Sequence, residues 1–150
     1  MAIRYRELGH VALRCKDYAK MYDFYVNKLH LEEKFHLNHE DGSLWLSYIH
    51  AGNGQYLELF PEGYDGDNGF ATHSQVHFCF EVGNFSAALT AIAAEGITVY
   101  SGPEEPELKP PYEKRAPGMC GSLCAFIRDP EGNWIEIMQF TPKSMQILCL

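Results

Sequence analysis

The stretch DPEGNWIEIMQF, residues 129–140, places a turn directly before a strand that carries one acidic side chain. The run Asp-Pro-Glu-Gly-Asn is typical of a hairpin turn, and residues 132–140 alternate as a strand does. Glu136 then shares a face with three apolar residues, Trp134, Met138 and Phe140. Burying an unpaired carboxylate there is costly, so a nearby cation or an open sheet face is needed.

A similar stretch occurs earlier in the chain. In QYLELFP, residues 55–61, Glu58 shares a face with Tyr56 and Phe60. Stretches 43–60 and 122–138 match in order: Ser-Leu, an apolar run, Gly-Asn near the turn, then Glu on the last strand. Internal repetition of this kind indicates a duplicated unit. The alternative is a chance resemblance between two α+β halves.

Each half also begins with a strand that carries a histidine. His10 lies in ELGHVALRC and shares its face with Leu8, Ala12 and Arg14. His77 lies in QVHFCFEV and shares its face with Gln75, Cys79 and Glu81. A concave sheet with these faces inward gathers His10, Glu58, His77 and Glu136 around one point.

The remaining pattern predicts an α+β fold in one domain, 1–150, made of two repeats at about 5–62 and 73–141. We expect helices at 18–29, capped by Asp17, and at 85–95, capped by Asn84 and ended by Gly96. The expected strands are 7–15, 32–39, 43–50, 54–61, 75–82, 97–101, 121–128 and 132–140. Residues 62–73 read as the linker between repeats.

Loop 102–120 is rich in proline and carries Lys109, Lys114 and Arg115, the one locally basic stretch of the chain. Long loops in compact domains are usually functional or disordered. Two interpretations stay open at this point: a lid that contacts an anionic substrate, or a solvated surface loop.

Composition excludes several functional classes. The net charge of −8 argues against a nucleic-acid partner. No apolar run approaches the roughly 18 residues of a membrane helix, and the first residues lack a signal-peptide core, so we expect no membrane partner and a cytoplasmic location. The five cysteines are odd in number and lack CxxC spacing, which favours structural or incidental thiols. The spacing Cys120-x-x-x-Cys124 is a weak metal or redox signal.

Two imidazoles and two carboxylates form a ligand set suited to catalytic Zn²⁺, Ni²⁺, Co²⁺, Mn²⁺ or Fe²⁺. The set leaves coordination positions for water or substrate, and one carboxylate is able to detach and act as a base. A lone strand histidine is more often a core or surface residue. We assign five others to that class: His30, His36, His39, His50 and His73.

Over residues 5–140 this pattern resembles the vicinal oxygen chelate superfamily, which contains glyoxalase I. DPEGNWIEIMQF is similar to the family's last hairpin. LGHVALRC, followed by a helix with Phe24-Tyr25, is similar to its opening. The resemblance implies paired βαβββ modules that form a curved, partly open mixed sheet.

The resemblance also implies site residues. His10, Glu58, His77 and Glu136 match the metal ligands of bacterial-type glyoxalase I, and Glu58 favours a glyoxalase over other relatives. Arg14 matches an arginine that contacts the glutathione part of the substrate. Glu62 replaces a family asparagine, which weakens the case for glutathione itself. Lys114 and Arg115 match the family's basic, substrate-binding loop residues loosely.

The implied activity is a metal-dependent lyase, with nickel or zinc, acting on a small-molecule thiol adduct. The hemithioacetal of methylglyoxal and a thiol becomes a lactoyl thioester by proton transfer through an enediolate. Glu136 is the expected base, with Glu58 assisting, in a homodimer with shared sites. One alternative is another superfamily enzyme: a thioester epimerase, a dioxygenase or a thiol transferase. The other is a metal-free small-molecule-binding protein.

Overall fold

The computed structural model describes residues 3–65 and 77–149. The chain divides into two compact units, Met1–Gly66 and Asp67–Leu150, called here the first and second unit. Most of the expected linker, the first two residues of the expected strand 75–82, and His73 lie outside the described residues.

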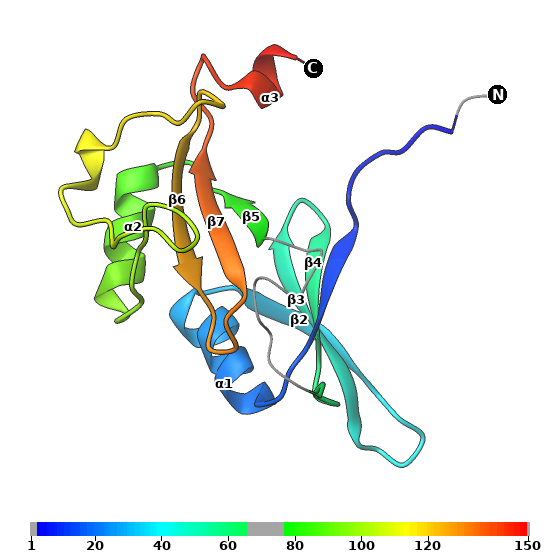
Figure 1. Ribbon diagram of the computed structural model, residues 1–150. Helices are drawn as coiled ribbons and strands as arrows, with labels where there is room; N and C mark the ends of the chain where they lie inside the picture. The colour runs from blue at the N-terminus through cyan, green and yellow to red at the C-terminus, as the bar shows by residue number, and fades with distance from the viewer. Residues whose placement is uncertain (1–2, 66–76, 150) are drawn as a thin grey trace. The chain divides into compact units, whose positions relative to one another are not determined.

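The first unit is a four-stranded mixed sheet with one helical segment (Figure 1). The strands β1 (His10–Arg14), β2 (Glu32–Asn38), β3 (Leu44–Gly52) and β4 (Gln55–Phe60) are ordered β1-β4-β3-β2. β1 runs parallel to β4, whereas β2–β3 and β3–β4 are antiparallel hairpins. The parallel pair is formed by the first and last strands of the unit, which are joined through the helix and the hairpin.

The helical segment begins where the sequence predicts. The Asp17 side chain accepts a hydrogen bond from the Lys20 amide, which satisfies one free donor of the first turn. Helix α1 (Tyr18–Tyr22) continues directly as the π-helix η1 (Asp23–Lys28), so the expected helix 18–29 changes its hydrogen-bond register midway. The segment buries Met21, Phe24 and Tyr25.

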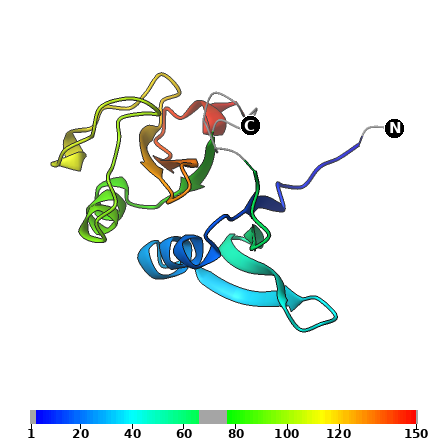
Figure 2. The ribbon, with the colours of Figure 1, turned by 60° about the horizontal axis from the view of Figure 1, so that its bottom comes forward.

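The second unit is a three-stranded mixed sheet ordered β5-β7-β6. Its elements are β5 (His77–Glu81), α2 (Phe85–Ala94), η3 (Tyr112–Lys114), β6 (Leu123–Arg128), β7 (Trp134–Gln139) and α3 (Met145–Leu148). β5 is parallel to β7, and β6 is antiparallel to it. Helix α2 lies beside the sheet (Figures 1 and 2), and its Phe85 amide donates to the Gln139 side chain on β7.

Helix α2 confirms both of its predicted boundaries. The Asn84 side chain accepts from the Ala87 amide, and Gly96 follows with a φ of +78°, a left-handed conformation that glycine adopts at low cost. Phe85, Leu89 and Ile92 form the buried face of the helix.

The expected strand 97–101 is wrong. Only Tyr100 pairs, through isolated bridges to Glu107 and Phe126. The chain folds back at once, with the Ser101 amide donating to the Pro106 carbonyl at 2.9 Å. The ladder with β6 stops after Tyr100, and the Cys124 carbonyl that the next pair would use accepts from the Arg115 side chain instead. The unit therefore repeats the βαβββ order of the first unit with its second strand reduced to one bridge.

The structure confirms the α+β class with two open, mixed sheets. The assignment of both repeats to one domain stays a prediction. Among the described residues, no helix is long and apolar enough to cross a membrane.

Candidate metal centre

In the first unit, the parallel pairing of β1 and β4 brings His10 and Glu58 together. His10 pairs with Tyr56 and Ala12 pairs with Glu58, so the imidazole and the carboxylate are diagonal neighbours on one sheet face. His10 Nε2 lies 3.5 Å from Glu58 Oε2. The His10 side chain is 55% exposed and the Glu58 side chain 10%, because β1 is an edge strand and β4 an inner one.

The second unit repeats this geometry on β5 and β7. His77 pairs with Trp134 and Cys79 pairs with Glu136, which is the same diagonal offset. His77 Nε2 lies 3.0 Å from Glu136 Oε2. The histidine is again on the edge strand and the glutamate on the inner strand.

Both pairs have a spacing that suits two ligands of one cation. Two ligands that lie about 2.1 Å from an ion, about 90–110° apart, are about 3.0–3.4 Å from each other. The measured N···O distances, 3.5 Å and 3.0 Å, are close to that range. The donor set, neutral imidazole nitrogen with carboxylate oxygen, suits a borderline divalent ion.

Each unit by itself supplies only two such ligands. Within residues 3–65 and 77–149, no group of three or more histidine, cysteine, aspartate or glutamate side chains is arranged to hold a metal ion. Joint binding of one cation by His10, Glu58, His77 and Glu136 therefore stays a prediction.

A tyrosine hydroxyl stands beside Glu58. Tyr48 pairs with Glu58 across β3 and β4, and its hydroxyl donates to the Glu58 carboxylate, which raises the pKa of Tyr48. Its ring stacks on Phe35, with centroids 4.2 Å apart, and meets Tyr56 edge-on. Two aromatic neighbours thus hold the Tyr48 ring in place beside the carboxylate.

Glu136 has different neighbours. Phe126 occupies the position equivalent to Tyr48 and meets the His77 ring edge-on, with centroids 5.1 Å apart. The thiols of Cys79 and Cys124 contact the Glu136 carboxylate instead. Desolvation, with the Glu136 charge, raises the pKa of Cys79 to about 12 and also raises the pKa of Cys124. Both thiols therefore stay protonated near neutral pH and are weak donors to the carboxylate.

Arg14 lies at the far end of β1 from His10, on the same face and about 13 Å along the strand. It lines a cavity of about 420 Å³ formed by residues of the first unit alone: Arg14, Lys16, Glu62, Gly63, Tyr64 and Asp65. The Lys16 ammonium lies 4.5 Å from the centre of the Tyr64 ring. The cavity thus carries both basic and acidic side chains, and Glu62, which departs from the family pattern, is one of them.

Two of the three basic residues of loop 102–120, Lys114 and Arg115, have different surroundings. Arg115 donates to the Cys124 carbonyl at 3.2 Å and to the Ser101 carbonyl at 2.9 Å, so it ties the loop to β6. Lys114 ends η3 and is exposed. Arg115 therefore has a structural role that the sequence analysis missed, and substrate binding by either residue stays a prediction.

The sequence analysis also missed Tyr48, Phe126 and the thiol contacts of Glu136. One signal was present in the repeat. Tyr48 and Phe126 each lie the same number of residues before the glutamate of their unit. Aligned hairpins place such residues opposite one another across the ladder.

Comparison with known proteins identifies relatives over most of the chain. The model of the Glyoxalase/Bleomycin resistance protein/Dioxygenase superfamily matches residues 7–137. No curated protein matches the sequence.

Several solved structures share the fold at low sequence identity. A glyoxalase family protein from Enterococcus faecalis is 22% identical with a TM-score of 0.67, covering 89% of this chain and 98% of that one. A glyoxalase/bleomycin resistance protein/dioxygenase from Alicyclobacillus acidocaldarius is 19% identical with a TM-score of 0.60, covering 93% of this chain and 95% of that one. The oxidase ChaP-H2 is 16% identical with a TM-score of 0.63, covering 95% of this chain and 99% of that one. These similarities support the fold and leave the reaction open.

Proposed function

Because this chain belongs to the glyoxalase/bleomycin resistance protein/dioxygenase superfamily, we propose that it is a metal-dependent lyase of the glyoxalase I type. Its substrate is the hemithioacetal of methylglyoxal and a thiol, and its product is a lactoyl thioester. The observation that carries the proposal is the repeated His–Glu pair. Each unit holds one imidazole and one carboxylate in the same register, with N···O distances of 3.5 Å in the first unit and 3.0 Å in the second.

His10, Glu58, His77 and Glu136 are the proposed ligands of one divalent ion, nickel or zinc. When bound, such an ion acts as a Lewis acid that stabilises negative charge on the substrate's oxygens. Superfamily members commonly bind a divalent metal, and the paired donors of this chain fit one.

Glu136 is the proposed base. Its carboxylate takes the proton from the carbon bearing the sulfur and returns it to the neighbouring carbon, through an enediolate of the substrate. Thiols of Cys79 and Cys124 lie beside the Glu136 carboxylate, in addition to His77, whereas the Glu58 carboxylate accepts from the stronger Tyr48 hydroxyl donor. Glu58 assists mainly as a ligand.

Arg14 is the proposed contact for the carboxylate of the thiol part of the substrate. Its separation from His10, about 13 Å, suits a thiol carrying a peptide-like extension. Glu62 in the same cavity favours a substrate that also presents an ammonium group. Exposed Lys114 is proposed to assist from its loop, and Arg115 to hold that loop in place.

The direct test combines metal analysis with a substrate panel. Purified protein should contain about one nickel or zinc ion per chain, and should form lactoyl thioester from methylglyoxal with at least one thiol among glutathione, cysteine and coenzyme A. A chelator should remove the activity, and added nickel should restore it. Turnover of a coenzyme A thioester without methylglyoxal activity would favour an epimerase. A metal-free protein that binds but does not convert these compounds would be a binding module.

We further propose that two copies associate and share their sites. Mixing His10→Ala with His77→Ala protein should then recover activity, because the mixed dimer has one site with all four ligands intact. With random pairing, the recovery is about a quarter of the unmutated activity. No recovery after subunit exchange would show that each site belongs to one chain.

A further inference from the structure

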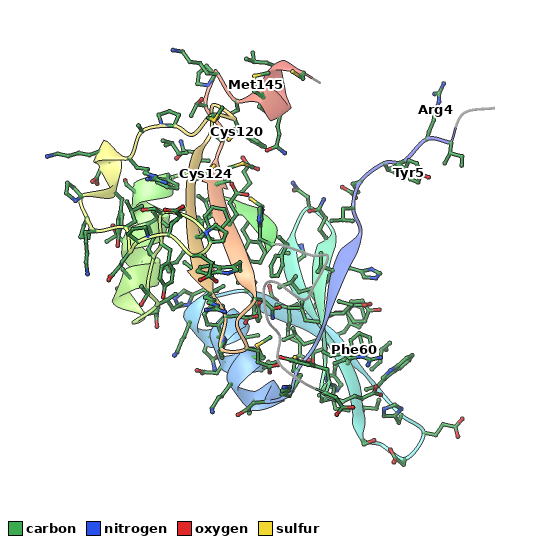
Figure 3. All side chains as sticks on the ribbon, in the orientation of Figure 1. Arg4, Tyr5, Phe60, Cys120, Cys124 and Met145 are labelled. Atoms are coloured by element: carbon green, nitrogen blue, oxygen red, sulfur yellow. The ribbon has the colours of Figure 1, made fainter. Side chains whose placement is uncertain are left out.

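Cys120 and Cys124 lie next to each other at the start of β6, in the second unit. Their Sγ atoms are 3.9 Å apart, and Figure 3 shows both side chains at the same end of that strand. A disulfide has an S–S length of about 2.05 Å, so the two sulfur atoms need to approach by only about 2 Å. Cys120 is exposed and Cys124 is half-buried.

The backbone around Cys120 is held by four hydrogen bonds. The Gly118 amide donates to the Ser122 carbonyl, and the Gly121 amide donates to the Gly118 carbonyl. From the next segment, the Met145 amide donates to the Cys120 carbonyl at 2.8 Å, and the Thr141 hydroxyl donates to the Gly121 carbonyl at 2.6 Å.

Gly121 makes this turn unusually specific. Its φ is +82°, and a Cβ at this position would lie 2.0 Å from the Lys143 carbonyl oxygen, so no other residue fits without a backbone shift. The turn therefore holds the backbone of Cys120 in one conformation next to Cys124. Side-chain rotation, without rearrangement of the loop, is the motion that closes the gap.

Cys79 is poorly placed to form a bridge with Cys124. Cys79 is on β5 and Cys124 on β6, with β7 between them and an offset of two residues along it, so their Cα atoms are more than about 9 Å apart. Bridged cysteines have Cα atoms no more than about 7 Å apart. Cys15 is buried in the first unit, and Cys149 is exposed after α3.

We propose that Cys120 and Cys124 are a redox modification site that forms a reversible intramolecular disulfide by exchange with a low-molecular-weight disulfide. The Cys120 thiolate attacks one sulfur of oxidised glutathione, forms a mixed disulfide and releases one glutathione thiolate. The Cys124 sulfur then attacks the Cys120 sulfur, gives up its proton and releases the second glutathione as a thiol. Two protein thiols are oxidised and one disulfide is reduced to two thiols; the two thiol hydrogens pass from the protein to glutathione, so no proton is released overall.

The bridge alters the surroundings of Glu136, because the Cys124 thiol that contacts this carboxylate loses its hydrogen. The thiol state of the solution is thereby coupled to the proposed base. This consequence rests on the proposed function, whereas formation of the bridge does not.

Peptide mapping tests the proposal without metal or substrate. The fully reduced protein is incubated with oxidised glutathione, its remaining thiols are alkylated with iodoacetamide, and it is digested with trypsin. Cleavage after Arg115 and Arg128 releases both cysteines in the single fragment 116–128, which contains no other cysteine. We expect most of this fragment to lack alkyl groups and to be two hydrogens lighter than its dithiol form, and dithiothreitol to reverse the change.

Two variants and one control complete the test. Cys124→Ser should leave glutathione attached to Cys120, because the resolving thiol is gone, and Cys120→Ser should give no bridge. Cys149→Ser, which removes an exposed thiol outside the pair, should behave as the unmutated chain does. Full alkylation of fragment 116–128 after oxidation, or a bridge from it to Cys79 or Cys149, would overturn the proposal.

Discussion

The His10–Glu58 and His77–Glu136 pairs have the same register and different surroundings. In both units a histidine on an edge strand meets a glutamate on the neighbouring inner strand at the same diagonal offset. Tyr48 donates a hydroxyl hydrogen to Glu58, whereas Glu136 has the Phe126 ring and two thiols beside it. The duplicated backbone determines where the ligands lie, and the neighbouring strands determine what each carboxylate is able to do.

The different neighbours of Glu58 and Glu136 favour different roles for the two carboxylates. Glu58 is 7% exposed and accepts from the Tyr48 hydroxyl, a stronger donor than a thiol. Glu136 lies beside two thiols, which are weak donors, and beside His77 Nε2 at 3.0 Å. This argument from side-chain contacts supports Glu136 as the base.

The largest expected effect is on kcat, and it distinguishes the role of Glu136 from that of Glu58. Glu136→Gln should lower kcat by about 10²–10⁴-fold, because the amide cannot accept the substrate's proton, while retaining part of the bound metal. Glu58→Gln should mainly weaken metal binding and recover much of its activity when metal is added in excess. Steady-state kinetics across a nickel titration distinguishes these outcomes, and equal kcat losses at saturating metal would remove the distinction.

Removal of either histidine tests whether the pairs act together. If one ion binds all four ligands, His10→Ala and His77→Ala should each lower the metal content from about one ion per chain to a small fraction of that. If the pairs bind separate ions, each variant should lose only half of the bound metal. Elemental analysis after gel filtration measures this, with His30→Ala, exposed and outside both pairs, as the control.

Exchanging the aromatic neighbours tests the surroundings directly. Tyr48→Phe removes the hydroxyl donor of Glu58 and should weaken metal affinity by about tenfold, the lower end of the range for groups that orient a ligand. Phe126→Tyr places a hydroxyl near Glu136 and should lower kcat several-fold, since a hydrogen-bonded carboxylate is a weaker base. Tyr56→Phe, on the strand of Glu58, is the matched control. Unchanged values in both exchanged variants would show that these donors have no influence.

The smallest expected effect compares the stability of the two helices. Asp17→Ala and Asn84→Ala each remove an N-cap and should lower the free energy of unfolding by about 1 kcal/mol. The corresponding decrease in Tm is about 2–4 °C for a chain of this size. Asp17→Ser and Asn84→Ser retain a cap and should stay near the unmutated Tm. Calorimetry shows whether the two units unfold in one transition or two.

Local patterns predicted much of this fold correctly. Asp17 and Asn84 cap helices because a short polar side chain satisfies amides two or three residues ahead. Leu13 is buried between exposed Ala12 and Arg14, as strand alternation requires. These features depend on neighbours within a few residues, so the sequence displays them.

Predictions failed where distant residues compete with a local pattern. Residues 97–101 are rich in β-branched and aromatic side chains, which predicts a strand. The chain turns back between Ser101 and Pro106, however, and within this stretch only Tyr100 forms bridges to other segments. The structural role of Arg115 was missed for a similar reason: the Cys124 and Ser101 carbonyls accept its hydrogens, while its predicted substrate binding stays a prediction. The sequence around Ser101 and Arg115 does not indicate which carbonyl groups accept their hydrogen bonds.

By itself, the sequence determined which four side chains are candidate ligands and which sheet faces they share, because strand periodicity is a property of consecutive residues. Tertiary structure alone decided that His10 meets Glu58 and His77 meets Glu136, and that a hydroxyl lies beside one glutamate and thiols beside the other. Strand register joins segments far apart in the chain, and it follows from packing of whole sheets rather than from any short stretch.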